Sequence, residues 1–434
     1  MSIQRRSEPR TNRNSHVFCG VLALLLVCPL AFGAVEPWSV FLLEVTSAAL
    51  FMLWAAFQLS SDELTVQWNP LFPPMVVFAG LVLLQLATGR TIYRYATVSG
   101  ALLYGAYGLT CFLVVQSLET TWRFKILAVS FSAYGFAVAM FALLQGLTSA
   151  KKLYWLRTPR GGGWICGPYV NHNHYAGLME MLFPIPLVFS LTVYAKGGLR
   201  RSAVLASAVM VTTIFLSGSR GGVIAFFCEI IVLFALLLRQ RRRIQLRGRL
   251  AFASFVILSG LLVGWIGSHE LANRLASVKL AKSELTDGVR IQIDRDLIRM
   301  FPRRPVLGSG LGTFADIYPQ YRSFYSDTSI DEAHNDYLQL LVEMGAAGFI
   351  TMIWFLWLVF WHASRKLSNW TTDANGAVAL AVILGVVGIL VHSLVDFNLQ
   401  IPANAAIFYV LCIIAAMEPR QRPLPVMGRY TRQA

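Results

Sequence analysis

The sequence predicts an all-α integral membrane protein with about twelve transmembrane helices and one long polar loop. Three observations support this prediction. Of the 434 residues, 56% are hydrophobic and only 14% are charged, a composition far more apolar than that of a soluble domain. The apolar residues come in runs of about twenty, long enough to cross ~30 Å of hydrocarbon at about 1.5 Å per residue. Polar residues collect between these runs, above all in the interval 268–336.

We expect helices at approximately 17–35, 38–59, 72–88, 96–117, 124–147, 174–195, 202–217, 221–238, 250–267, 337–361, 376–395 and 402–417. The chain then divides into a basic N-terminus (1–16), transmembrane helices one to nine (17–267), the long loop (268–336), helices ten to twelve (337–417) and a basic tail (418–434). The first apolar stretch ends in Ala31-Phe-Gly-Ala34, which leaves open whether it is a cleaved signal peptide.

The distribution of Lys and Arg predicts the orientation of the helices. Basic residues gather in the N-terminus, in the short connections 122–125, 196–201, 239–249 and 365–366, and in the tail from Arg420. Short cytoplasmic connections are enriched in Lys and Arg, so we expect both termini in the cytoplasm. The segments 35–38, 88–95, 150–173, 217–222 and 396–402 then lie outside with the long loop, whose own arginines are tolerated because long loops cross a membrane largely regardless of charge.

Charge and cysteine content exclude several other classes of protein. The net charge of +15 comes from short basic clusters between apolar runs, which set membrane topology, so we expect no nucleic-acid binding. Of the six cysteines, all but Cys166 lie within apolar runs. The sequence therefore implies no disulfide framework, no metal site and no cofactor.

The long loop contains recognisable segments. Residues 288–300 have the spacing of an amphipathic helix, with Val289, Ile293, Leu297 and Met300 on one stripe, and this helix should stop before Pro302. A glycine-punctuated turn follows at 305–314, and an aromatic stretch at 318–325 should pack over the membrane surface. We expect little packed core within the loop itself.

The end of the loop places a histidine where a new apolar helix begins. Ser329-Ile-Asp-Glu332 has the spacing of a capping box, Asp331 is an alternative N-cap, and His334 would then lie in the first helical turn. The positive end of the helix dipole favours a neutral, proton-accepting imidazole, as a general base requires. The alternative is an interfacial histidine that is hydrogen-bonded to the loop backbone.

The motif around this histidine resembles that of bacterial O-antigen ligases and their relatives, the O-antigen polymerases and the O-linked protein oligosaccharyltransferases. The resemblance rests on Glu332-Ala-His-Asn-Asp-Tyr-Leu-Gln-Leu-Leu-Val-Glu-Met-Gly-Ala-Ala-Gly-Phe349, in which His334-Asn335 is followed by Gly345 and Gly348. The stretch Pro305-Val-Leu-Gly-Ser-Gly-Leu-Gly-Thr-Phe314 is also similar to the family. The resemblance extends from about Gly167 to the C-terminus and implies the GT-C-like O-antigen ligase fold.

The resemblance implies transfer of a glycan from undecaprenyl diphosphate to a hydroxyl acceptor on the periplasmic face of the bacterial inner membrane, by a metal-independent inverting displacement. It gives His334 the role of catalytic base. A diphosphate leaving group needs cationic partners, and arginine binds such groups through a bidentate fork. The resemblance maps two arginines to that role, Arg220 in the turn 217–222 and Arg290 in the loop. Other loop arginines compete with Arg290, namely Arg295, Arg299, Arg303, Arg304 and Arg322.

Other polar residues are candidates for substrate binding. Asn171, His172 and His174 precede the helix predicted at 174–195, and with Arg322 and Asn335 they complete the predicted substrate-binding set. A metal site at the two histidines would need a third ligand, which the sequence does not supply. The alternative for the residues at 171–174 is a purely structural role, namely capping of the following helix at the membrane interface.

Acidic residues near the predicted membrane edges offer weaker candidates. Asp294-Arg-Asp296 matches the acidic motif of metal-dependent glycosyltransferases, but we interpret it as solvated helix surface. Glu36 and Asp396 lie at membrane edges, and for both we expect helix capping.

Several functional alternatives remain open at the level of sequence. The acceptor is lipid A-core in a ligase, another lipid-linked glycan in a polymerase of O-antigen or exopolysaccharide, or a protein hydroxyl in an oligosaccharyltransferase. From another class, the chain could be a small-anion transporter with Arg220 in its path, although neither paired broken helices nor internal repeats are present. A third alternative is a non-catalytic scaffold in a polysaccharide assembly complex.

Overall fold

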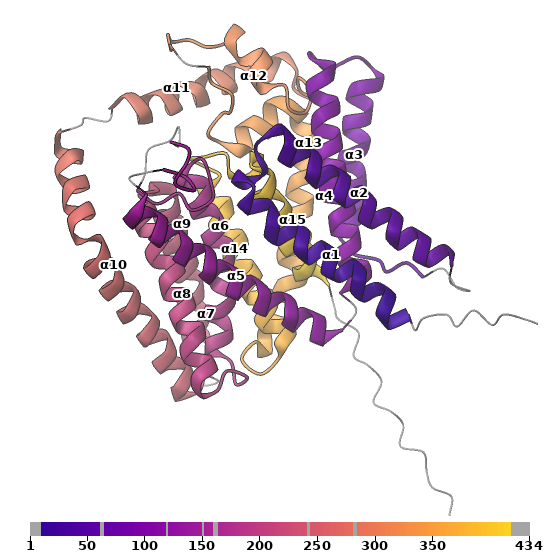
Figure 1. The fold of residues 1–434 in the computed structure, drawn as a ribbon. Coiled ribbons are helices and arrows are strands. Elements are labelled where there is room, and N and C mark those ends of the chain that lie inside the picture. Colours follow the sequence, from indigo (N-terminus) through magenta and orange to yellow (C-terminus); the bar gives the residue numbers. More distant parts are fainter. Residues whose placement is uncertain are drawn as a thin grey trace, which may run out of the picture.

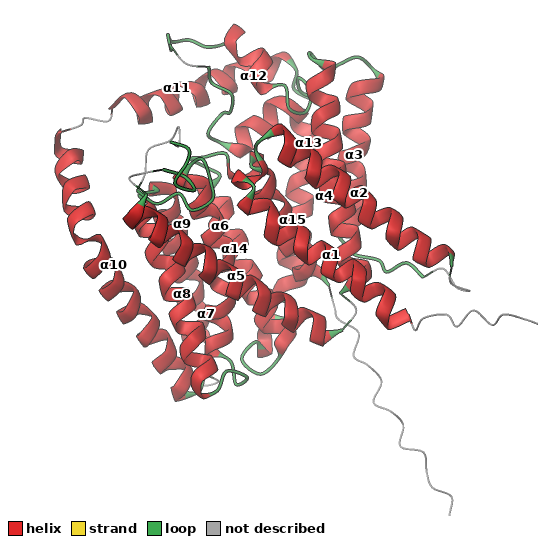
Figure 2. Cartoon of the chain, in the orientation of Figure 1, coloured by secondary structure: helices red, strands yellow, loops and turns green. Residues whose placement is uncertain are grey.

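The computed structural model describes residues 10–60, 65–118, 120–149, 152–158, 164–240, 244–280, 284–327 and 329–417. Within these ranges the regular structure is helical (Figure 2), and an isolated β-bridge joins Leu153 and Arg157. This finding confirms the all-α prediction. The predicted tail, 418–434, lies outside the described residues.

The helices form one bundle with an extension across its upper end (Figure 1). Their bounds are α1 Arg10–Leu30, α2 Pro37–Leu59, α3 Phe72–Ala87, α4 Arg94–Ser117, α5 Thr121–Thr148, α6 His172–Leu182, α7 Pro184–Leu191, α8 Gly197–Ser217, α9 Arg220–Arg239, α10 Leu246–Leu280, α11 Glu284–Met300, α12 Phe314–Ile317, α13 Asp336–Ser364, α14 Ala374–His392 and α15 Pro402–Ala416. Figure 1 shows α10 along the left edge and α11 and α12 across the top.

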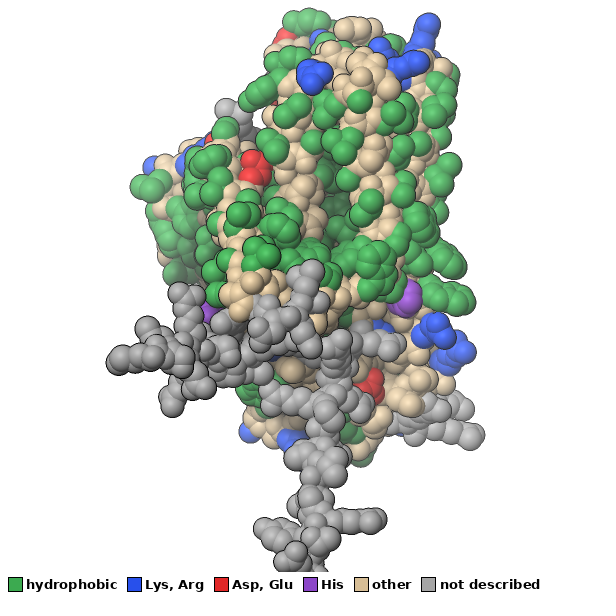
Figure 3. Space-filling view, turned by 90° about the vertical axis from the view of Figure 1, so that its right-hand side faces the viewer, with side chains coloured by type: hydrophobic (Ala, Val, Ile, Leu, Met, Phe, Trp, Pro, Cys, Tyr) green, Lys and Arg blue, Asp and Glu red, His purple; other side chains and the backbone are tan. Residues whose placement is uncertain are grey.

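Most of these helices are long and apolar enough to cross a membrane. Among the described residues nine such segments occur, within α2, α4, α5, α6–α7, α8, α9, α10, α13 and α14, and three shorter apolar helices accompany them at Asn14–Leu30, Phe72–Ala87 and Pro402–Ala416. Hydrophobic side chains cover the face shown in Figure 3, with basic side chains near its upper and lower ends. The chain is therefore an integral membrane protein, and the number of twelve crossings stays a prediction.

Polar contacts group the connections into two opposite ends of the bundle. At one end, Arg123 at the start of α5 donates to Ser15 Oγ of α1 at 2.9 Å. Gln240, just after α9, donates to the carbonyl of Leu367, just after α13, at 2.9 Å. These connections belong to the set that the basic residues predict to be cytoplasmic.

At the opposite end, Glu36 before α2 pairs with Arg157, with 2.5 Å between Oε1 and Nη1. Glu36 is the N-cap residue of α2 by position, but its side chain makes no cap hydrogen bond, so the capping prediction is wrong for this carboxylate. Gln85 of α3 donates to the carbonyl of Leu307 in the long loop at the same end. The connections predicted to lie outside thus meet one another.

The helix predicted at 174–195 is broken. The chain forms α6 and then α7, with the break at Phe183 and Pro184 at the first position of α7. A proline cannot donate a backbone hydrogen bond to the preceding turn, so it favours a new helix start over continuation. This break lets α6 and α7 pack separately in the interior.

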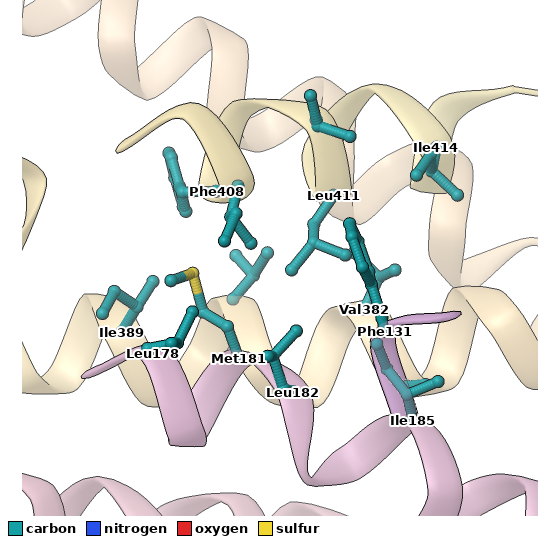
Figure 4. Packing of buried hydrophobic residues seen from close by; sticks show 14 of the residues in the cluster. Phe131, Leu178, Met181, Leu182, Ile185, Val382, Ile389, Phe408, Leu411 and Ile414 are labelled. Carbon is teal, nitrogen blue, oxygen red and sulfur yellow. The ribbon is translucent and has the colours of Figure 1, made fainter. Parts of the chain in front are cut away.

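The interior of the bundle is packed around α6, α7, α14 and α15. Leu178, Met181, Val382, Phe408 and Leu411 are buried and point toward one another (Figure 4). Nearly all residues of the membrane-spanning segment α6–α7 are buried in the interior, 94% of them, whereas α10 and α2 bury only 17% of theirs. These central helices therefore form a rigid support for the polar residues at their upper ends.

The long loop has a packed core of its own, contrary to the sequence prediction. The predicted stripe is confirmed in α11, because Ile293, Leu297 and Met300 are buried. They cluster with Phe314 and Tyr318 from the following segment. The aromatic stretch therefore packs partly within the loop and not only on the membrane surface.

Asp296 also differs from its predicted solvated state. It is only 1% exposed, and its Oδ2 accepts hydrogen bonds from Tyr318 Oη at 3.1 Å and from the Ser323 backbone N–H at 2.9 Å. This carboxylate holds the aromatic segment against α11, which is a structural role.

A kink in α13 fixes the glycine-rich turn of the loop. Gly345 has φ 65° and ψ −171°, and a Cβ at this position would meet the backbone of Val306. At the kink Ala346 N–H donates to the Pro305 carbonyl at 2.8 Å, and Ser309 N–H donates to the Val342 carbonyl at 2.9 Å. The glycine of the histidine motif is thus required for this crossing of loop and helix.

Candidate active site

His334 lies just before α13 and not within its first turn. Asn335 is the N-cap residue and its side chain accepts from the Leu338 N–H at 3.2 Å. Glu332 instead accepts from the side chain of Gln339, so the predicted capping box does not form. His334 has φ 56°, a left-handed conformation that is uncommon outside glycine and costs strain. This conformation turns the imidazole toward the end of α14.

The segment after α14 is fastened to the start of α13 by Asp336. Its backbone N–H donates to the Ser393 carbonyl at 3.0 Å, and its Oδ2 accepts from Ser393 Oγ at 2.7 Å and from the Leu399 N–H at 3.0 Å. The residues between Ser393 and Leu399 are therefore held beside His334, which lies two residues before Asp336.

Asp396 is the centre of the polar group at this end of the bundle. Its Oδ1 lies 3.3 Å from His334 Nδ1 and 3.9 Å from His174 Nε2. Its Oδ2 accepts a hydrogen bond from the side chain of Asn173 and lies 3.8 Å from Arg290 Nη2. The prediction that Asp396 merely caps a helix is wrong, because its side chain joins α6, α11 and the residues before α13.

The environment of Asp396 keeps its carboxylate ionised. Burial alone would raise the pKa of Asp396, but the hydrogen bond with His334 and the charges of the surrounding histidines outweigh burial and hold that pKa below its usual range. An ionised carboxylate at Oδ1 favours the tautomer of His334 that carries its proton on Nδ1. The Nε2 atom of His334 is then left as a proton acceptor.

Exposure distinguishes the two histidines that flank Asp396. Both rings lie edge-on to Phe397, with ring centroids 4.7 Å apart in each case. The side chain of His334 is 29% exposed, whereas that of His174 is 7% exposed. Only His334 combines the carboxylate partner with access to a substrate, so His174 is better placed to support Asp396 than to exchange protons with an acceptor.

The turn after α14 lies against Arg290 and against the start of α9, whose first residue is Arg220. Arg290 donates from Nη1 to the carbonyl of Val395 at 2.7 Å. Arg220 is the first residue of α9 and is exposed, and a Cβ on its neighbour Gly221 would lie 3.0 Å from Val395. An anion bound at this turn would lie beside the Arg290 guanidinium and near the N-terminus of α9, which begins with Arg220.

A buried polar group below this turn was not predicted. His392 Nδ1 lies 2.9 Å from Glu180 Oε1, and His392 Nε2 lies 3.3 Å from Ser219 Oγ. Ser219 is the N-cap residue of α9 and accepts from the Gly222 N–H at 3.1 Å. This chain of contacts holds the turn that carries Arg220, and its signals in the sequence are two titratable residues inside apolar runs, Glu180 and His392.

The remaining predicted residues have mixed outcomes. Asn171 is the N-cap residue of α6 and accepts from the Asn173 N–H at 2.9 Å, which is the capping role. His172 is the first residue of α6. Asn335 caps α13. Arg322 follows Tyr318 in the loop core, and no contact places it with His334 among the described residues.

The donor set does not resemble a metal centre. Within the described parts of the chain, no three His, Cys, Asp or Glu side chains are arranged to hold a metal ion. The site is instead an imidazole–carboxylate pair beside arginines, which suits proton transfer next to a bound anion.

Comparison with known proteins gives one match. A family model described as O-antigen ligase matches residues 205–353, a segment that runs from α8 into α13 and contains Arg220, Arg290 and His334. Asp396, Glu180 and His392 lie outside that segment. No curated protein matches the chain.

Proposed function

Because the match over residues 205–353 supports membership of the O-antigen ligase and polymerase superfamily, we propose that this protein transfers a glycan from undecaprenyl diphosphate to an acceptor hydroxyl. The transfer takes place at the periplasmic face of the bacterial inner membrane. The observation that carries this proposal is the pairing of partly exposed His334 with buried Asp396 beside Arg290.

The proposed reaction is a single displacement with inversion at the anomeric carbon. The acceptor hydroxyl gives its proton to Nε2 of His334 while its oxygen forms the new bond to that carbon. Asp396 holds the Nδ1 proton of His334 and stabilises the imidazolium that results. The bond from the anomeric carbon to the diphosphate oxygen breaks, and the electron pair leaves with the undecaprenyl diphosphate.

The departing diphosphate needs positive charge where its own charge develops. Arg220 and Arg290 supply guanidinium groups, and α9 adds the partial positive charge of a helix N-terminus. Arg290 Nη2 lies 3.8 Å from Asp396 Oδ2, and Asp396 also pairs with His334, so this carboxylate couples the base to the leaving group. These two arginines are preferred to Arg322, whose backbone belongs to the loop core.

A lipid-linked donor also needs space for its hydrocarbon chain. An apolar cavity of about 530 Å³ lies between α3, α4, α13 and α15, with Phe78, Tyr104, Met352 and Phe355 in its walls. The cavity is connected to the candidate site through α13, which lines the cavity and begins two residues after His334. A cavity with this lining suits a prenyl chain better than a sugar.

The test is transfer from purified lipid-linked glycan by wild type and His334→Ala protein. Loss of one general base should lower the rate on the order of a hundredfold or more. The matched control is His362→Ala, which removes a histidine at the other end of α13. Near wild-type transfer by His334→Ala would show that the proposed mechanism is wrong.

A second assay identifies the acceptor. A deletion strain is complemented with wild type, His334→Ala or Arg220→Ala, and surface polysaccharide is resolved by chain length. A polymerase variant should leave single repeat units attached at the surface, whereas a ligase variant should accumulate long lipid-linked chains. If both variants restored normal polysaccharide, the protein would be a scaffold and not the transferase.

A further inference from the structure

A second polar site lies at the far end of α8 from His334. Three arginines line a cavity of about 390 Å³ there, Arg200 and Arg201 from α8 and Arg247 from α10. Because α8 has 21 residues, which span about 30 Å, this cavity and the turn of Arg220 lie near opposite membrane surfaces. The first two turns of α8 and the first four turns of α10 form its walls.

The arginines of this cavity have no acidic partners. Among the described residues, no carboxylate pairs with Arg201 or Arg247, and Arg200 donates only to the Thr192 carbonyl, at 3.0 Å. The Nε of Arg200 is buried without a hydrogen-bond partner. Three guanidinium groups around one cavity repel one another, so the arrangement favours an anionic ligand.

The deeper walls of the cavity are mainly apolar. Val204, Leu250, Ala251 and Leu258 line it together with Ser254. Leu258 lies eleven residues beyond Arg247 along α10, which is about 16 Å into the hydrocarbon. A soluble phosphate would leave this apolar part unfilled, whereas an acyl chain would occupy it.

The cavity opens at the edge of the bundle. Figure 1 shows α8 and α10 side by side at its left margin, and Leu250 is exposed on α10. A molecule entering here therefore comes from the bilayer and reaches arginines at the level of the lipid headgroups.

We propose that Arg200, Arg201 and Arg247, with the apolar walls between α8 and α10, bind an anionic phospholipid of the membrane leaflet opposite the candidate active site. The phosphate pairs with the arginines and one acyl chain lies along Val204, Ala251 and Leu258. Since three cations surround the cavity, a lipid with two phosphates binds more tightly than a lipid with one.

The experiment measures lipid binding to the purified full-length protein by native mass spectrometry in neutral detergent. The probes are cardiolipin with two phosphates, phosphatidylglycerol with one, zwitterionic phosphatidylcholine, and inorganic phosphate. Wild type should bind cardiolipin most tightly and phosphatidylcholine least. The double variant Arg201→Gln/Arg247→Gln should weaken cardiolipin binding on the order of thirtyfold.

The matched control is Arg239→Gln/Arg249→Gln, which removes two arginines from the same side of the molecule but none from the cavity. It should keep most of the cardiolipin affinity. A separate variant, Ser254→Phe, keeps all arginines and fills the space below them, and it should also weaken binding. This variant tests the site even if the double arginine variant fails to fold.

Three results would overturn the proposal. The first is an equal loss of cardiolipin affinity in the lining and control double variants. The second is full cardiolipin binding by Ser254→Phe. The third is inorganic phosphate that occupies the site as tightly as the lipid does. The measurement needs no glycan donor or acceptor, so its outcome is independent of the proposed transferase activity.

Discussion

Asp396 contacts both His334 and Arg290, and Asp396→Asn tests its role. An asparagine amide can donate to His334 Nδ1, which forces the proton onto Nε2 and removes the proton acceptor. We expect the turnover rate to fall on the order of tenfold or more, with a smaller change in the KM for the lipid-linked donor. Steady-state transfer kinetics measure both quantities.

A control separates this effect from the loss of a negative charge. Asp316→Asn removes an exposed carboxylate from the same end of the molecule, at α12, and should leave turnover near wild type. If Asp396→Asn also retained wild-type turnover, Asp396 would be a structural residue and the tautomer of His334 would not depend on it.

Glu332 gives a prediction about pH. Burial, helped by the charges of Glu343, Asp336 and Asp331, raises the pKa of Glu332 to about 8 against the lowering effect of its hydrogen bond from Gln339. An unfolded glutamate titrates near 4.5, so ionisation opposes folding as pH rises between these values. Wild type should lose thermal stability from pH 5 to pH 9 through this group, and Glu332→Gln should lose less.

The measurement is the melting temperature in detergent at both pH values. Asp327→Asn, at an exposed loop position, is the control and should follow the wild-type dependence. Identical pH dependence for Glu332→Gln and wild type would mean that Glu332 is ionised in the folded protein at neutral pH.

At the scale of single residues, the sequence predicted only those members of the candidate site that belong to a local motif. Local motifs predicted His334, Arg220 and Arg290, and the structure brings His334 and Arg290 to Asp396. Asp396 itself lies 62 positions from His334, and only the fold brings the two together. His392 was missed because a histidine in an apolar run gives no sign of its partner.

At the scale of elements, the first turn of α9 depends on two glycines. A Cβ at Gly221 would meet the ring of His392, and a Cβ at Gly222 would lie 2.9 Å from Ala176 Cβ and from Glu180 Oε1. Gly221→Ala should therefore displace Arg220 from the candidate site. We expect transfer to fall on the order of tenfold to a hundredfold, because small misplacements of a positioning group have effects of that size.

The control for this prediction is Gly264→Ala in α10. A Cβ there meets no atom within 4 Å, and alanine has the better helix propensity. Gly264→Ala should keep full activity and thermal stability. Equal activity in Gly221→Ala and Gly264→Ala would show that the close packing of α9 on His392 has no part in transfer.

Helix positions followed from apolar runs, but their ends and breaks did not. The run at 174–195 is apolar over most of its length, so its hydropathy hides the break that Pro184 introduces. The helix α10 continues to Leu280, beyond the predicted end at 267, because helix formation does not stop where hydrophobicity stops. The predicted start of the helix at 337 agrees with α13 to within one residue, but its predicted cap was wrong, because several residues could cap it and Asn335 does so.

At the scale of the whole molecule, the predicted orientation of the helices leads to a labelling test. Ser323 lies in the long loop and Ser202 in the first turns of α8, and both positions are exposed. In spheroplasts, a membrane-impermeant maleimide should label Ser323→Cys at once and Ser202→Cys only after the membrane is broken. The reason is that Lys and Arg in short connections hold those connections in the cytoplasm.

The wild-type chain controls for its own cysteines, most of which are buried. Labelling of Ser202→Cys before Ser323→Cys would invert the orientation and place His334 away from lipid-linked glycans in the periplasm. It would also move the proposed phospholipid cavity to the outer leaflet without changing its contacts. The two sites therefore share one topology, and this single measurement decides which membrane surface each of them faces.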